Sequence, residues 1–234
     1  VDAGNMVVRA FDPRDPQAPI ATIAGTNGVV QQGEGTAIAV NGPAGLAVDA
    51  QDRVVFAELG GSTIKRLADG AVGLLAGTSS GFADGPALAA AFNTPGGLAY
   101  GPGGELWILD TVKPRLRRLS SAGVVETLAG LGTTGALAGD LGAPSLPALA
   151  HELGRPLFVA VGPDGRPYWT DNAFNVVMRL SADGRAERVA GVVPARFDKD
   201  GGFADGPAAE ARFNRPAGLA FDAAGDLYVA DLGN

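Results

Sequence analysis

The chain has 234 residues, no cysteine and a formal net charge of −7. The absence of cysteine excludes disulfide bonds and thiolate chemistry, and the acidic balance argues against a phosphate-rich partner such as a nucleic acid. We find no run of 18 or more apolar residues and expect no membrane-spanning helix. The 36 glycines and 16 prolines favour many short strands joined by tight turns.

Four segments repeat one pattern along the chain: an apolar strand, a turn, and a second apolar strand that ends in an acid. The segments are residues 42–58, 94–110, 155–171 and 215–234, the last of which continues three residues past its acid. A further acid, Asp2, stands at the start of the chain. The five recurring acids lie 56, 52, 61 and 60 residues apart, and they are Asp2, Glu58, Asp110, Asp171 and Asp231.

Two more strands follow each of the first four acids. The third strand carries a recurring arginine, and the fourth ends in a glycine at Gly25, Gly77, Gly130 and Gly191; the arginines are Arg9, Arg66, Arg118 and Arg179. Turn pairs such as Asp69-Gly70 and Asp183-Gly184 supply the positive φ that tight hairpins need. A four-stranded meander repeated at this spacing predicts an all-β propeller of four-stranded antiparallel blades, with about four repeats in this chain.

The pattern P-x-G-L-A-x-D-x-x-G-x-L-Y-V-A-D, followed by R-x-R-R-L and T-L-A-G, resembles the NHL repeat of bacterial proteins and covers nearly the whole chain. We therefore expect one propeller domain over 1–234, with repeats at 42–77, 94–130 and 155–191 and a fourth made of 1–25 with 215–234. Repeat 155–191 departs most from the pattern, with Leu157-Phe158 where Gly-Leu stands elsewhere. The resemblance implies that the first strand of each blade is innermost, and it favours an extracytoplasmic or secreted location.

The two ends of the chain carry complementary parts of one repeat. Residues 1–25 supply a third and a fourth strand, whereas residues 215–234 supply a first and a second. In one interpretation the two parts form a composite blade that closes a ring of four and protects both edge strands. In the other, the chain is part of a longer array, or self-associates, because NHL-type propellers are usually six-bladed. Val1 begins within a repeat, so we expect a mature, trimmed or partial form.

Two connecting segments also echo each other. Residues 81–95 and 202–216 share G-F-A-D-G-P, which predicts the start of a short helix with proline in its first turn. We expect Phe82 with Phe92, and Phe203 with Phe213, to hold such a helix against the blade edge.

The recurring acids and arginines have two interpretations. They could form a ring of charged ligands around a channel, or each acid could accept backbone hydrogen bonds in its own turn, with the arginine nearby. Recurrence in every blade favours the structural interpretation, because a functional site on a propeller normally breaks the symmetry.

Candidates for chemistry are few. Oxygen ligands for Ca²⁺ or another divalent ion are weakly indicated at Asp49, Asp222, Asn172 and Asn175, without the spacing of an EF-hand, and we otherwise expect no cofactor. His151 is the only histidine, so a zinc site of several imidazoles is excluded, and we expect it on the surface.

Two further motifs have simpler explanations. Residues 130–135 match G-x-G-x-x-G but close a blade in a meander rather than open a βαβ unit. A basic cluster, which we expect to be exposed, is formed by Lys113, Arg115, Arg117 and Arg118; an RNA or phosphate groove there disagrees with the overall acidity.

The core and the function follow from the propeller prediction. We expect a non-catalytic, rigid binding or scaffold module for a protein or small-molecule ligand on a propeller face. The alternatives are a hydrolase or lyase with a divalent metal in the channel, and an isolated or engineered fragment without activity of its own. The predicted core comprises Leu46, Val48, Leu98, Phe158, Leu219 and Phe221 from first strands, and Val55, Trp107, Tyr168 and Tyr228 from second strands.

Overall fold

The computed structural model describes residues 1–15, 17–25, 39–132, 145–193 and 201–234. The chain divides into two compact units, Val1–Gly96 and Gly97–Asn234, and the boundary falls within one strand, β8 (Pro95–Tyr100). The two units are therefore described one after the other. All sheets are antiparallel, as the sequence predicted, and the only helix in the described residues is the single-turn 3₁₀ helix η2 (Ala148–Ala150).

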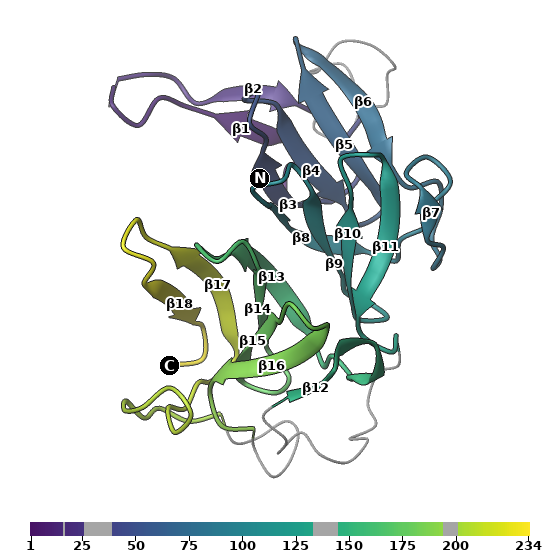
Figure 1. Ribbon diagram of the computed structural model, residues 1–234. Helices are drawn as coiled ribbons and strands as arrows, with labels where there is room; N and C mark the ends of the chain where they lie inside the picture. The colour runs from purple at the N-terminus through teal and green to yellow at the C-terminus, as the bar shows by residue number, and fades with distance from the viewer. Residues whose placement is uncertain (16, 26–38, 133–144, 194–200) are drawn as a thin grey trace. The chain divides into compact units, whose positions relative to one another are not determined.

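The first unit holds a two-stranded sheet and a four-stranded sheet (Figure 1). The apolar side chains Val8, Ala24, Val40 and Phe56 form one buried cluster that joins the two sheets. The strands of this unit are β1 (Val8–Ala10), β2 (Ala21–Ala24), β3 (Pro43–Val48), β4 (Val54–Glu58), β5 (Thr63–Ala68), β6 (Ala71–Ala76) and the short β7 (Gly85–Pro86).

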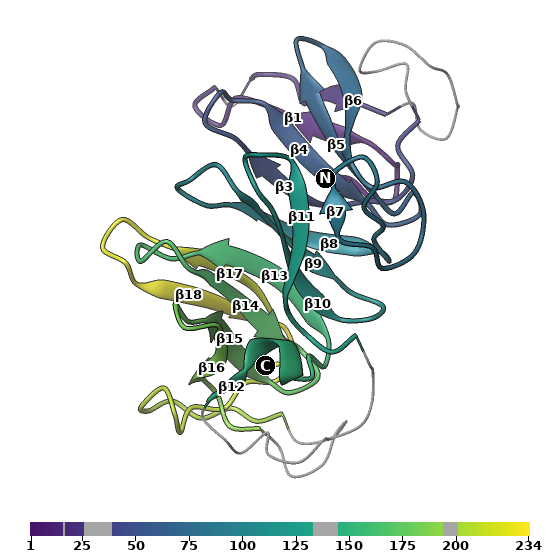
Figure 2. The ribbon, with the colours of Figure 1, turned by 45° about the vertical axis from the view of Figure 1, so that its right-hand side comes forward.

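The second unit holds two complete blades and a further two-stranded sheet. Strand β13 lies beside β9 of the preceding blade and beside β17 of the following sheet, so that the three sheets stack in sequence order (Figures 1 and 2). The first blade comprises β8 with β9 (Leu106–Asp110), β10 (Arg115–Leu119) and β11 (Val124–Ala129). The second comprises β12 (Ser145–Pro147), β13 (Pro156–Val161), β14 (Pro167–Asp171), β15 (Val176–Leu180) and β16 (Arg185–Ala190). The two-stranded sheet comprises β17 (Pro216–Phe221) and β18 (Leu227–Asp231).

Each blade turns where the sequence predicted. The turns between first and second strands, and those between third and fourth, place residues in the left-handed region; these residues are Asp52, Asp69, Gly70, Gly104, Gly165, Gly184 and Gly225. Glycine, aspartate and asparagine tolerate that conformation better than other residues. The turn chemistry in the sequence therefore defined the strand ends correctly.

The glycine that ends each fourth strand has a shared steric cause. Gly77 and Gly130 have φ values of +94° and +97°, and a Cβ atom on Gly130 would lie 2.4 Å from the carbonyl oxygen of Pro114. Gly25 and Gly191 have the same conformation and a similar close approach. A side chain at this position would collide with the start of the third strand.

The second strands confirm most of the predicted core. Val55 is fully buried, and Trp107 and Tyr168 are 5% and 8% exposed. The prediction that Tyr228 belongs to the core is wrong. Its side chain is 62% exposed, because no third strand lies beside β18 in the described residues.

The first strands confirm less of it. Leu98 is 6% exposed, but Leu46 and Val48 are 37% and 50% exposed, and Leu219 and Phe221 are half-buried. Phe158 is 46% exposed and Val159 is buried in its place. Counted back from the acid of each blade, Val159 is the equivalent of Leu98, so the prediction for Phe158 was one residue out of phase. The first strand of each complete blade is also an edge strand of its sheet, which leaves some of its side chains uncovered.

The helix predicted in the connecting segments is only one turn. Residues 87–89 form a turn closed by the N–H of Ala90, which donates to the carbonyl of Pro86 at 2.9 Å. Phe92 is fully buried and Phe82 half-buried, whereas Phe203 of the second copy is 74% exposed. Within the described residues the two terminal sheets, β1–β2 and β17–β18, each remain two-stranded, and their completion into a blade stays a prediction.

Candidate functional site

In the three complete blades the recurring acid ends the second strand and is buried. Glu58, Asp110 and Asp171 are between 0% and 2% exposed. Asp171 accepts four backbone hydrogen bonds, two from Ala173 and Phe174 in its own turn and two from Gly154 and Arg155. A buried carboxylate needs such donors to offset its loss of hydration.

Three of the acids also bind the segment that leads into the first strand of the same sheet. The N–H of Asn41 donates to Glu58 Oε1 at 2.9 Å, the N–H of Asn214 donates to Asp231 Oδ1 at 2.8 Å, and the N–H of Arg155 donates to Asp171 Oδ1 at 2.9 Å. The sequence predicted bonds within the acid's own turn, which Asp171 makes, but not this longer link. The sequence signal that could have indicated this longer link is the similar spacing of the donor and the acid, which are 16 or 17 residues apart in each case.

In three repeats the acid also faces a cation seven residues later. The pairs are Asp2 with Arg9 at 3.7 Å, Glu58 with Lys65 at 3.0 Å, and Asp110 with Arg117 at 3.3 Å. In the third complete blade this position is Met178, opposite Trp169. Burial raises the pKa of Asp171, the acid without such a cation, while its four N–H donors act in the opposite direction.

The predicted arginines have other partners. Arg118 pairs with Glu126 at 2.7 Å and Arg179 with Glu187 at 2.6 Å, each across the third and fourth strands. Arg66 lies opposite Gly73, which offers no carboxylate. Arg9 stands one position earlier in its repeat, level with Lys65 and Arg117, and is therefore the one of the four that pairs with its acid.

Within the second unit, Asp222 is not brought together with Asn172 and Asn175, and Asp49 belongs to the first unit. Asp49 and Asp222 occupy equivalent turns between first and second strands, where each accepts two backbone N–H groups. Asn172 and Asn175 lie in a turn between second and third strands, and Asn175 Oδ1 accepts the N–H of Arg215 at the start of β17. Asp222 follows the other end of β17, six residues or about 20 Å away.

His151 is buried rather than on the surface. Its side chain is 5% exposed, and Nδ1 has no hydrogen-bond partner among the described residues. Burial lowers the pKa of His151, and the charge of the neighbouring Glu152 opposes this shift. Among the described residues, no three histidine, aspartate or glutamate side chains gather closely enough to hold a metal ion.

The two remaining motifs have structural roles. Gly130 ends β11 in an antiparallel meander, while residues 133–135 of the G-x-G-x-x-G match lie outside the described residues. The basic cluster is not one exposed patch: Arg117 is 1% exposed and paired with Asp110, Arg118 pairs with Glu126, and Lys113 is exposed. No helix in the described part of the chain is long and apolar enough to cross a membrane.

The turns after the acids present apolar side chains to solvent. We call the end of each blade that carries this turn its acid end. Leu59, Val112 and Leu232 follow three of the acids by one or two residues and are 37%, 50% and 67% exposed. In the second unit, Leu131 follows β11 at the same end of its blade and is 44% exposed. The turns that follow these acids therefore display apolar groups.

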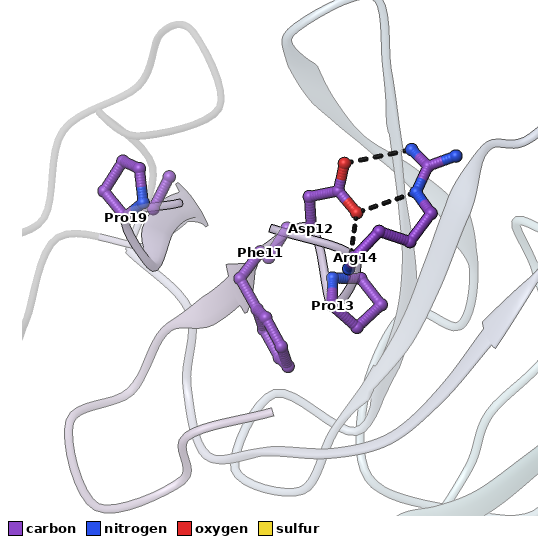
Figure 3. Close-up of a pocket in the computed structure, with 7 residues that line it drawn as sticks. Phe11, Asp12, Pro13, Arg14 and Pro19 are labelled. Carbon is purple, nitrogen blue, oxygen red and sulfur yellow. Dashed lines mark hydrogen bonds and ion pairs between the residues drawn. The ribbon is translucent and has the colours of Figure 1, made fainter. Parts of the chain in front are cut away.

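A hollow of about 540 Å³ lies beside the loop between β1 and β2 (Figure 3). Phe11, Asp12, Pro13, Arg14 and Pro19 line it, and Asp12 pairs with Arg14 at 2.9 Å. Phe11 is 61% exposed and the Arg14 side chain 89%. The hollow is thus an open surface of one hairpin without a buried polar group aimed into it.

Stacked antiparallel sheets of four strands define a β-propeller, and known structures match this fold. The chain is 15% identical to virginiamycin B lyase from Staphylococcus aureus, with a TM-score of 0.58 over 98% of this chain and 58% of that chain. It is 17% identical to a chain of a nidogen–laminin complex, with a TM-score of 0.61 over 99% of this chain and 69% of the other. It is 13% identical to an auxiliary nutrient-binding protein from Bacteroides thetaiotaomicron, with a TM-score of 0.63 over 97% and 67%.

The sequence itself carries the repeat of this fold. Residues 213–234 match the model of the NHL repeat, as expected from the pattern in the sequence. No curated protein sequence matches the chain significantly. The chain spans 58% of the lyase and about two thirds of the other two structures, at identities that establish the fold alone.

Proposed function

We propose that the chain is a non-catalytic NHL-type propeller that acts as a rigid binding or scaffold module. The observation that carries this proposal is the use of its recurring acids. Their oxygens accept backbone N–H groups and pair with Lys65 and Arg117, so these carboxylates hold turns in place rather than point at a ligand. Loops on a rigid frame are the usual place for recognition.

The contact surface of this module is the acid end of the blades in the second unit. Its exposed apolar side chains, Val112 and Leu131, suit a protein or a small apolar ligand. Two of the matched folds belong to proteins whose names describe binding, the nidogen–laminin complex and the nutrient-binding protein, and this supports a binding role.

Selection from a peptide display library tests the proposal. The folded chain serves as bait, and the selected peptides are then measured against Val112→Asp and, as a matched control, Leu74→Asp on β6. Both side chains are about half exposed, at 50% and 49%, but Leu74 lies within strand β6 rather than in a turn that follows an acid. We expect Val112→Asp to weaken binding at least tenfold and Leu74→Asp to leave it unchanged. Equal effects of the two variants would place the contact surface elsewhere.

The second candidate is a hydrolase or lyase with a divalent ion in its channel, favoured by the matched lyase fold. Asp49 and Asp222 supply carboxylate oxygens of the kind that Ca²⁺ prefers, but each is engaged with its own turn. Mass spectrometry of the native protein separates the two candidates. One divalent ion for each chain would favour the enzyme.

A further inference from the structure

Two arginines of the second unit lie at equivalent positions of neighbouring first strands. Arg155 directly precedes β13, and Arg215 directly precedes β17. Both residues are exposed, and neither forms an ion pair with a carboxylate in the part of the chain that the structure describes. The other two repeats have Gly42 and Thr94 at this position. The arginine pair is therefore not a general feature of the repeat.

One turn, between β14 and β15, holds the backbone of both arginines. The N–H of Arg155 donates to Asp171 Oδ1 at 2.9 Å, and its carbonyl accepts the N–H of Asn172 at 3.1 Å. The N–H of Arg215 donates to Asn175 Oδ1 at 2.7 Å. Because β13 also lies beside β17, the two arginines flank this single turn at the acid end (Figures 1 and 2).

The carboxylates of the same sheets are engaged elsewhere. Asp171 is 1% exposed and accepts four backbone N–H groups, and the half-buried Asp231 accepts the N–H of Asn214. The exposed Asp205 and Glu210 lie in the part of the connecting segment that bonds to the end of β16, a fourth strand. Positive charge therefore prevails where the first strands β13 and β17 begin, although the whole chain carries a net charge of −7.

An exposed aromatic side chain follows Arg155 on β13. Phe158 is 46% exposed, and it lies where the pairing of β13 with β14 shifts register, between Pro156 and Val159. A bulge of this kind can direct a side chain out of its sheet. Counted back from the acid, the equivalent residues of the other repeats are Gly45, Gly97 and Gly218. Phe158 thus breaks the symmetry of the repeat at an exposed position, as a binding residue does.

We propose that Arg155, Arg215 and Phe158 bind an acidic segment of a protein partner, in which carboxylates flank an apolar side chain. Guanidinium groups bind carboxylates through paired, charge-assisted hydrogen bonds, and a phenylalanine ring offers apolar contact area. Small molecules usually bind in enclosed cavities, whereas these three residues are exposed, so a protein segment is the occupant to which we commit. The inference rests on the proposed binding function and defines the chemistry of its ligand.

Calorimetric titration with a short synthetic peptide of glutamate and leucine tests the inference. The matching peptide of glutamine and leucine is the control for charge, and we expect only the acidic peptide to bind. Arg155→Gln and Arg215→Gln should each weaken its binding about tenfold, the effect of losing a charge-assisted hydrogen bond. Arg166→Gln makes the same change of charge between β13 and β14, at the other end of the blade, and should leave binding unchanged.

Phe158→Gly tests the aromatic contact separately. The variant introduces the residue of the other repeats, so we expect it to fold, as thermal unfolding would verify. It should weaken binding of the acidic peptide about tenfold, because one large apolar side chain is no longer buried against the ligand. Phe203→Gly, which changes a 74% exposed phenylalanine in the connecting segment, is the matched control and should have no effect.

Equal affinity for the two peptides, or an equal effect of Arg166→Gln, would overturn the inference. Tighter binding of phenylacetate than of the acidic peptide would identify a small molecule as the occupant and would overturn it too. Library selection separates this failure from that of the proposed function. Selected peptides without acidic residues, whose binding depends on Val112 but not on Arg155, would overturn the inference and leave the proposed function standing.

Discussion

The carboxylate of Asp110 lies 3.3 Å from the guanidinium of Arg117, and both side chains are almost completely buried. The neighbouring Arg118 makes a shorter contact, 2.7 Å, with Glu126, but those side chains are 37% and 47% exposed. The energy of an ion pair depends strongly on burial, because removal of one partner from a buried pair leaves an uncompensated charge without water. The two arginines therefore provide a matched comparison on one strand.

We expect Arg117→Met to lower the free energy of unfolding by about 3–5 kcal/mol. Arg118→Met should cost less than about 1 kcal/mol, since solvent screens that pair. Urea denaturation of both variants measures the difference. The double variant Asp110→Asn, Arg117→Met should be less destabilised than the sum of its single changes, and strict additivity would show that the two groups do not interact.

Asp171 supports a second prediction, about the link between a blade and its preceding segment. Asp171→Ala removes the acceptor for four backbone N–H groups, and each buried donor left unsatisfied costs about 1–3 kcal/mol. We expect a loss of at least about 3 kcal/mol in unfolding free energy. Hydrogen exchange should accelerate at the amides of Gly154 and Arg155, which lie far from Asp171 in sequence. Unchanged exchange there would contradict the anchoring role.

His151 predicts a pH dependence of stability. Its pKa in the folded chain lies below the ordinary value of 6.5, so the unfolded chain binds the proton more tightly. The contribution of neutral His151 is fully present above pH 6.5 and is lost as the pH falls through 6.5 toward the lowered pKa. As the pH is lowered from about 8 to about 5, the unfolding free energy of the native chain should therefore decline.

The variant His151→Gln should lack this part of the decline. Because the chain has one histidine, a single set of imidazole NMR signals reports its titration directly. A midpoint at or above 6.5 would contradict the effect of burial.

Gly97 marks a close approach between the first strands of two neighbouring blades. A Cβ atom there would lie 2.8 Å from the carbonyl oxygen of Leu157 and 3.2 Å from the Cα of Phe158. We expect Gly97→Ala to destabilise the chain by about 1–3 kcal/mol, because backbone must move to admit the methyl group. The control is Gly73→Ala on β6, where a Cβ would meet nothing within 4 Å. Thermal unfolding should separate the two variants clearly, and equal melting temperatures would show that the strands can move apart freely.

Much of the fold was predictable because it is encoded locally. The alternation of apolar residues and the positive-φ residues Asp69, Gly70 and Gly104 defined strands and turns within a few residues of themselves. The prediction of a helix at 81–95 was wrong. Proline and an acid permit a first helical turn, but nothing in the segment extends that turn past Ala90. The sequence also located the recurring acids, of which Glu58, Asp110 and Asp171 are buried.

The partners of those acids were less predictable, because they come from distant parts of the repeat. The donor to Glu58 lies 17 residues earlier, at Asn41, and the cation of Asp110 is Arg117 rather than the recurring Arg118. Strand register determines which of two adjacent arginines faces the acid, and a shift in β10 between Leu116 and Arg117 sets that register.

Tyr168 and Tyr228 separate what the sequence determined from what the tertiary structure decided. The sequence places both tyrosines at the same position of the same repeat, and both lie on a second strand as expected. Only the tertiary structure makes one 8% exposed and the other 62% exposed. The physical reason is that strand formation depends on neighbouring residues in the chain, whereas burial depends on whether another strand lies alongside.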